Sequence, residues 1–127
     1  MQQIIVNTEE APRAIGPYVQ ARKVGPFLFT SGQIALDPKS GELVGDDVAT
    51  QCRLALKNLG AVVNAAGLRL TDVVKTTVFL KDMGDFATVN GLYAEFFGDH
   101  KPARSCIEAA GLPKGALIEI ECIAHGG

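Results

Sequence analysis

The alternation of side chains along residues 117–124 constrains the fold of this chain more than any other feature. Successive side chains of a strand point to opposite faces of a sheet, so a strand here presents two different faces. One face is apolar and needs a covering layer, whereas the other mixes two carboxylates with two large apolar groups. The apolar face consists of Ile118, Ile120, Cys122 and Ala124, and the mixed face of Leu117, Glu119, Glu121 and Ile123.

Two segments have the periodicity of helices that could supply the covering layer. The first is predicted over residues 48–66, with an N-cap at Asp46 or Asp47, and it ends where Gly67 follows. The second begins after the turn at residues 82–85 and ends near residue 98. Its apolar stripe is interpreted as core and consists of Phe86, Val89, Tyr93 and Phe96 or Phe97.

The other patterned segments predict strands. They are residues 3–6, 19–24, 27–34, 73–80 and 104–109. With the final strand, this order predicts an α+β fold: one six-stranded sheet with two helices packed on one face. The strand from Val73 is predicted to place Val74, Thr76, Val78 and Leu80 on one face and Val73, Lys75, Thr77 and Phe79 on the other.

Two helices cannot cover both faces of such a sheet. A face that mixes charge with Val, Phe, Leu and Ile is unusual in contact with water. We therefore expect further copies of the chain to cover it, with the buried charges paired or used for function.

Length and composition limit the possible functions. A chain of 127 residues has room for one domain, predicted to span residues 1–127. The formal net charge is −2 and there is no basic stripe, which argues against binding of nucleic acid. No apolar run is long enough to span a membrane, and the N-terminal residues lack a signal-peptide pattern. Three cysteines without C-x-x-C spacing predict reduced thiols and a cytoplasmic location.

Several common catalytic motifs are missing. The chain contains neither a phosphate-binding P-loop nor a dinucleotide-binding glycine motif. His100 and His125 have no ligand partner at short spacing, so no metal site is expected. Ser31 does not stand in a G-x-S-x-G turn, which argues against a serine hydrolase.

The most informative side chains are an arginine and two glutamates on late strands. Period two places Arg104 and Cys106 on one face of their strand, and Glu119 and Glu121 on one face of theirs. If these two strands form a hairpin, Arg104 and a glutamate flank one cleft. There the arginine could bind a carboxylate and the glutamate could orient a water. The alternative is an ordinary cross-strand ion pair between Arg104 and Glu119, which spacing alone favours.

Six segments resemble, in order and at compatible spacing, the reactive intermediate deaminase (Rid, YjgF-type) family. The resemblance extends over essentially the whole chain and is closest to the deaminating branch, because the arginine of P-A-R-S is present. The segments are AIGPY at residues 14–18, TSGQ at 30–33, VKTTVF at 74–79, DFATVN at 85–90, PARS at 102–105, and LPKG through IEIE at 112–121.

This resemblance implies a chorismate-mutase-like fold assembled as a trimer around a central barrel, with clefts between subunits. It implies hydrolysis of 2-iminoacids or 2-aminoacrylate, made by pyridoxal-phosphate enzymes, to 2-ketoacids and ammonia. No metal or organic cofactor is expected. An imine is already electrophilic, so fixing its carboxylate and placing one water could suffice.

The resemblance also assigns roles to individual residues. Arg104 matches the arginine that binds the substrate carboxylate, and Glu119 matches the acid that holds the attacking water. Tyr18 matches a tyrosine that lines the cleft; before the resemblance is considered, packing at a subunit interface is an equal alternative for it. Cys106 is expected to contribute its backbone N–H rather than its thiol. The positions near the cleft are Ser31, Gly32 and Asn90.

Three other functions remain open at this point. A non-catalytic protein could bind 2-ketoacids or other small carboxylates in the same cleft. An endoribonuclease activity is ascribed to family members, but the net charge argues against it. An oxidation-activated holdase chaperone could use the apolar interface as its binding surface.

Overall fold

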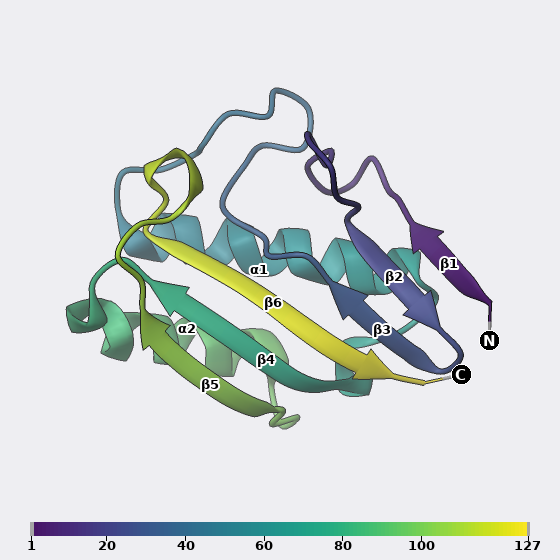
Figure 1. Ribbon diagram of the computed structural model, residues 1–127. Helices are drawn as coiled ribbons and strands as arrows, with labels where there is room; N and C mark the ends of the chain where they lie inside the picture. Colours follow the sequence, from purple (N-terminus) through teal and green to yellow (C-terminus); the bar gives the residue numbers. More distant parts are fainter. Residues whose placement is uncertain (1, 127) are drawn as a thin grey trace.

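The computed structural model, which describes residues 2–126, contains one six-stranded sheet with two helices against one face (Figure 1). The strand order is β1-β2-β3-β6-β4-β5, and every neighbouring pair is antiparallel except β4 and β5. The two ends of the predicted domain, residues 1 and 127, lie outside the described residues. The strands are β1 (Gln3–Val6), β2 (Ala21–Val24), β3 (Phe27–Thr30), β4 (Val73–Leu80), β5 (Ala103–Glu108) and β6 (Ile118–His125), and the helices are α1 (Val48–Ala65) and α2 (Phe86–Phe97).

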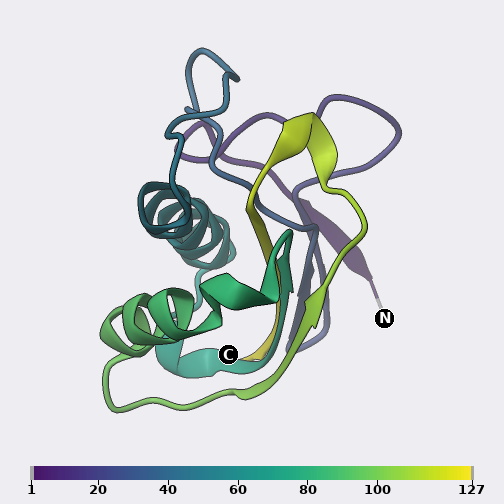
Figure 2. The same ribbon diagram turned by 90° about the vertical axis from the view of Figure 1, so that its left-hand side faces the viewer.

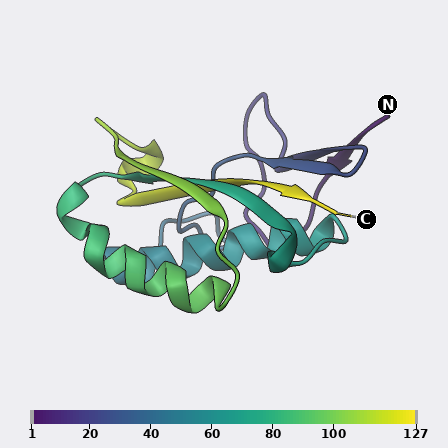
Figure 3. The same ribbon diagram turned by 90° about the horizontal axis from the view of Figure 1, so that it is seen from below.

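The α+β prediction is therefore confirmed, and both helices lie on the same side of the sheet (Figures 2 and 3). Asp47 caps α1: its carboxylate accepts a hydrogen bond of 3.0 Å from the Thr50 N–H. Gly67, just beyond the end of α1, has a φ of +80°, the left-handed conformation in which glycine commonly follows a helix. No helix within residues 2–126 is long and apolar enough to cross a membrane.

The core lies between this helical layer and the sheet. The side chains of Ile118, Ile120, Cys122 and Ala124 on β6 are buried, as the alternation predicts. From α1, Leu59 and other apolar residues pack against them. The register of β6 thus assigns one set of residues to the core and leaves Glu119 and Glu121 on the face without helices.

That second face is the mixed face expected from the sequence. Phe27 and Phe29 on β3 are 43% and 46% exposed, and Ile107 on β5 is 48% exposed. They lie on the same side of the sheet as the two glutamates of β6, because Phe29 pairs with Ile123 and Ile107 shares the partner Phe79 with Glu119. In a single chain, this face has no covering layer.

The predicted faces of β4 are wrong at its start. The register between β4 and β6 shifts at a β-bulge between Val73 and Lys75, so two consecutive residues do not alternate. Val73 is fully buried in the core, whereas Val74 is 46% exposed. From Lys75 onward the alternation is as predicted. A bulge adds a residue without changing the apolar composition, so the sequence pattern did not reveal it.

The strand predicted over residues 27–34 is interrupted after Thr30. Phe29 pairs with Ile123 and Gln33 pairs with Ile120. Between these two pairs, the segment after β3 advances four residues while β6 advances three, so the segment after β3 contains one extra residue. At the interruption, the Thr30 hydroxyl accepts a 2.9 Å hydrogen bond from the Cys122 N–H. A side chain replaces the backbone acceptor there, and the extra residue lies in the Ser31–Gly32 segment.

The two helices contact each other closely at a glycine, and this generates a stability prediction. A Cβ at Gly60 of α1 would lie 3.2 Å from the Phe96 ring of α2, whereas a Cβ at Gly91 of α2 would meet nothing within 4 Å. We expect Gly91→Ala to raise the free energy of unfolding by about 0.5–1 kcal/mol, because alanine restricts the unfolded chain. Gly60→Ala should lack this gain in urea unfolding. An equal gain at both positions would contradict the close contact.

Candidate functional site

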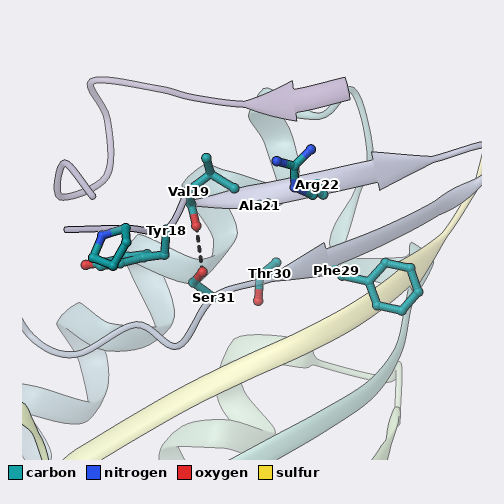
Figure 4. Close-up of a pocket in the computed structure, with 8 residues that line it drawn as sticks. Tyr18, Val19, Ala21, Arg22, Phe29, Thr30 and Ser31 are labelled. Atoms are coloured by element: carbon teal, nitrogen blue, oxygen red, sulfur yellow. Dashed lines mark hydrogen bonds between the residues drawn. The ribbon is translucent and has the colours of Figure 1, made fainter. Parts of the chain in front are cut away.

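One group of the predicted site residues lies where β2 begins and β3 ends. A hollow of about 550 Å³ there is lined by Tyr18, Arg22, Phe29 and Ser31, among others (Figure 4). The Ser31 hydroxyl donates a 2.6 Å hydrogen bond to the Val19 carbonyl, which ties the loop carrying Tyr18 to the end of β3. The Tyr18 side chain is 53% exposed, so it is available to a ligand or to another subunit.

The Glu119 carboxylate lies directly over Gly32. Backbone hydrogen bonds of 2.8 and 3.0 Å between Gln33 and Ile120 hold the two segments side by side. A Cβ at Gly32 would collide with Oε2 of Glu119 and would also lie 2.7 Å from its Cδ. The backbone of Gly32 does not have a positive φ. A side chain at this position would force the Glu119 side chain to move, and the absence of a Cβ allows the carboxylate to lie against the backbone.

Burial raises the pKa of Glu119, and the nearby Glu121 carboxylate raises it further. Both effects disfavour the ionised form. In the sheet, Phe79 is the direct cross-strand neighbour of Glu119, and Thr77 is that of Glu121. The carboxylate thus lies on a half-buried surface, with an aromatic side chain beside it and the open Gly32 backbone on the other side.

Arg104 lies on the edge strand β5, and its side chain contacts helix α2. Its Nη1 donates a 2.8 Å hydrogen bond to the Asn90 side-chain oxygen. Its guanidinium carbon is 5.4 Å from the centre of the Phe86 ring and 4.9 Å from that of Tyr93. Asn90, Tyr93 and Arg104 also line a groove of about 390 Å³ along α2. An exposed arginine so placed can bind a carboxylate through its remaining N–H groups.

Cys106 follows Arg104 on the same face of β5. It pairs with Val78, is half-buried, and packs against the core. Burial raises the pKa of its thiol, and the Arg104 charge offsets only part of this effect. A thiol that is protonated at neutral pH is a poor nucleophile, so the geometry agrees with a structural or backbone role.

The strands of Arg104 and Glu119 do not form the hairpin that would have placed both side chains in one cleft. β4 lies between β5 and β6, because β5 pairs in parallel with β4. Arg104 is paired with Thr76, whose buried side chain faces the helices, whereas Glu119 is paired with Phe79 on the other face. Arg104 and Glu119 thus lie on opposite faces of one sheet. In a single chain they form neither one cleft nor a cross-strand ion pair.

The interpretation of Phe86 as a core residue is also wrong. It is 36% exposed and faces the guanidinium of Arg104, whereas Val89, Tyr93 and Phe97 of the same stripe are buried. The signal for this contact was in the sequence, since Phe86, Asn90 and Tyr93 are spaced i, i+4 and i+7 on one helix face. Sequence reasoning assigned only Asn90 to the site.

Comparison with known proteins identifies the family. The family model described as endoribonuclease L-PSP matches residues 8–126. The chain belongs to the endoribonuclease L-PSP family. Among curated L-PSP relatives, the 2-iminobutanoate/2-iminopropanoate deaminase of Salmonella typhimurium is 57% identical, with 94% of each chain covered.

Solved structures of the L-PSP family agree with this assignment. The YjgF gene product of E. coli superposes with a TM-score of 0.91 at 54% identity, covering 96% of this chain and 98% of that one. E. coli TdcF with bound serine superposes with a TM-score of 0.93 at 49% identity, covering 98% and 99%. The resemblance to the YjgF-type deaminases is therefore confirmed. Within residues 2–126, no group of three or more His, Cys, Asp or Glu side chains is placed to hold a metal ion.

The contact between Gly32 and Glu119 in this L-PSP chain can be tested by a double-mutant cycle. Gly32→Ala should force the Glu119 side chain to move and should destabilise the protein by about 0.5–1.5 kcal/mol, the cost of an off-rotamer side chain. The same change should cost much less in a Glu119→Ala background, because the colliding atoms belong to that side chain. Urea unfolding of the four proteins gives the coupling energy. Gly111→Ala, which meets nothing within 4 Å, is the control. A zero coupling energy would contradict the contact.

Proposed function

We propose that this chain is a 2-iminoacid deaminase, which hydrolyses 2-iminoacids and their enamine form, 2-aminoacrylate, to 2-ketoacids and ammonia. One observation carries the proposal. Asn90 accepts one hydrogen bond from the guanidinium of Arg104, and this exposed side chain has further N–H groups with which to bind a carboxylate. A relative that is 57% identical is named 2-iminobutanoate/2-iminopropanoate deaminase. Another relative has been solved with bound serine, which carries an α-carboxylate beside an amine.

In the proposed assembly, three copies form a trimer and each site combines residues of two copies. Arg104, Asn90 and Cys106 form one half-site on the helix side of β5. Tyr18, Ser31, Gly32 and Glu119 form the other, next to the exposed face of the sheet. Two observations support sharing between copies: the half-sites lie on opposite faces, and the exposed face carries large apolar side chains. The number three rests on the family resemblance.

The mechanism follows from these two half-sites. Two N–H groups of Arg104 bind the substrate carboxylate, and the Cys106 N–H is a further donor. The Glu119 carboxylate of the neighbouring copy orients a water toward the imine carbon and accepts one of its protons. Attack forms a carbon–oxygen bond while the C=N electron pair moves to nitrogen. Glu119 passes its proton to that nitrogen. The carbinolamine then collapses: its hydroxyl proton moves to nitrogen, a C=O bond forms, and the C–N bond breaks to release ammonia and leave the 2-ketoacid.

The environment of Glu119 is suited to this task. Because its pKa is raised, the carboxylate is a stronger base than an ordinary surface glutamate. No cofactor is needed in the proposed steps, because the imine carbon is already electrophilic. We further propose that the protein acts in the cytoplasm, where its three free thiols remain reduced and where it protects pyridoxal-phosphate enzymes from their reactive products.

The proposal is tested by trapping the imine. A serine or threonine dehydratase generates it, semicarbazide captures what survives, and the purified protein competes for it. We expect the wild-type protein to reduce the trapped product. Arg104→Ala should lower kcat/KM by about a hundredfold or more, because a charged clamp is lost. Arg53→Ala, on the solvent face of α1, is the matched control and should behave as wild type.

The outcomes of this assay separate the alternative functions. Unchanged trapping with every protein, together with binding of a 2-ketoacid, would replace the deaminase by a non-catalytic binder. Suppression of client aggregation only after oxidant treatment would favour a holdase. Salt-dependent cleavage of RNA would favour the endoribonuclease of the family name, against which the net charge of −2 argues.

The sharing of the site between copies predicts complementation. Arg104→Ala and Glu119→Ala proteins, each impaired alone, are mixed, unfolded and refolded together. About a quarter of the sites should then combine an intact arginine with an intact glutamate, and a corresponding share of activity should return. Refolding each variant alone is the control. If the mixture stays as inactive as its components, the two residues belong to one copy's site.

A further inference from the structure

Helix α2 presents a stripe of three side chains to Arg104. Phe86, Asn90 and Tyr93 lie at i, i+4 and i+7, so they follow one face of the helix. Both aromatic rings lie within 6 Å of the guanidinium carbon, the range of a cation–π interaction. Asn90 adds the 2.8 Å hydrogen bond to Nη1. All three contacts converge on one side chain that is otherwise exposed.

The Tyr93 ring is itself held in place from two sides. Its hydroxyl is 2.7 Å from that of Thr76, which is fully buried. The ring of Phe97 packs beside it, with 4.7 Å between centroids. Thr76 is also the cross-strand partner of Arg104 in the β4–β5 ladder. The surface on which the guanidinium lies is therefore tied to the strand that carries Arg104.

A free arginine on an edge strand has many rotamers, and binding a ligand to it costs the entropy of ordering them. Contacts that order the side chain beforehand remove part of this cost. In residues 2–126, Arg104 makes one hydrogen bond, to Asn90, so N–H groups remain for a carboxylate. The rings contact the guanidinium without using any of its N–H donors.

We propose that Phe86 and Tyr93 are positioning residues, which together with Asn90 hold the Arg104 guanidinium in its carboxylate-binding orientation before the ligand arrives. The proposal builds on the carboxylate clamp of the proposed function and assigns the two aromatic side chains a role in ligand affinity. They act through Arg104 and do not themselves contact the reacting atoms of the substrate.

The first test is the affinity for pyruvate, a small 2-ketoacid, measured by calorimetry. Phe86→Leu keeps an apolar side chain but removes the ring, and it should weaken binding about three- to fivefold. Phe86→Tyr restores a ring and should bind as the wild type does. Phe96→Leu removes a ring of the same helix that does not contact Arg104, and it should leave the affinity unchanged. Equal affinity of the leucine and tyrosine variants at position 86 would overturn the proposal.

The same logic applies to Tyr93. Tyr93→Phe keeps the ring beside Arg104 and loses only the hydroxyl. It should therefore lower the Tm but leave the affinity for pyruvate close to that of the wild type. Tyr93→Leu should lower both. In a purely structural role the two substitutions would change affinity only in proportion to Tm, and that result would count against positioning.

A second measurement does not depend on ligand or catalysis. The Nε–H of Arg104, assigned by NMR from its absence in Arg104→Ala, should show a high order parameter in the ligand-free wild-type protein. The order should fall in Phe86→Leu and be retained in Phe86→Tyr and Phe96→Leu. Equal order in all four proteins would refute the positioning role. If the wild type shows no deamination in the trapping assay while this ring-dependent order is present, the proposed function fails and the positioning role stands.

Discussion

The register of β6 is the constraint on which the rest of the structure depends. This strand is paired on both sides, with β3 and with β4, and its alternate residues close the core beneath the helices. A shift of one residue would bring Glu119 and Glu121 into the core and expose Ile118 and Ile120. The core therefore holds Glu119 on the exposed face, and the contact with Gly32 follows from that placement. The core residues and the proposed catalytic carboxylate thus lie on opposite faces of one strand.

Arg104 depends on a different part of the fold. Its strand lies at the edge of the sheet, where it has one neighbour, and helix α2 supplies the contacts on the helix side. The carboxylate group and the cationic group are thus supported by separate elements, β6 with the end of β3 in one case and β5 with α2 in the other. The sheet separates them, and this separation is the reason that we propose a site shared by two copies.

The sequence predicts most of the fold because the signals for its elements are local. The helix that begins after Asp47 and the alternation of β6 are visible in the residues themselves, and the family resemblance contributed the expected roles of the site residues. The pairing of β5 was not predictable from spacing, since a strand that follows a helix can pair with either neighbour. The bulge at Val73 depends on the ladder, and the position of Phe86 depends on where β5 lies. Each of these required long-range contacts that no local pattern contains.

The opposite placement of Arg104 and Glu119 has a consequence for how activity would vary with protein concentration. A lone copy can complete its core, because the helices cover the face that needs covering, yet it holds only unconnected halves of the proposed site. In the proposed assembly, folding would be governed by the single chain, whereas catalytic activity would be governed by mass action between chains. On dilution below the dissociation constant of the assembly, turnover per chain would fall while the fold persisted. Cellular abundance would then set the specific activity of each molecule as well as the number of molecules.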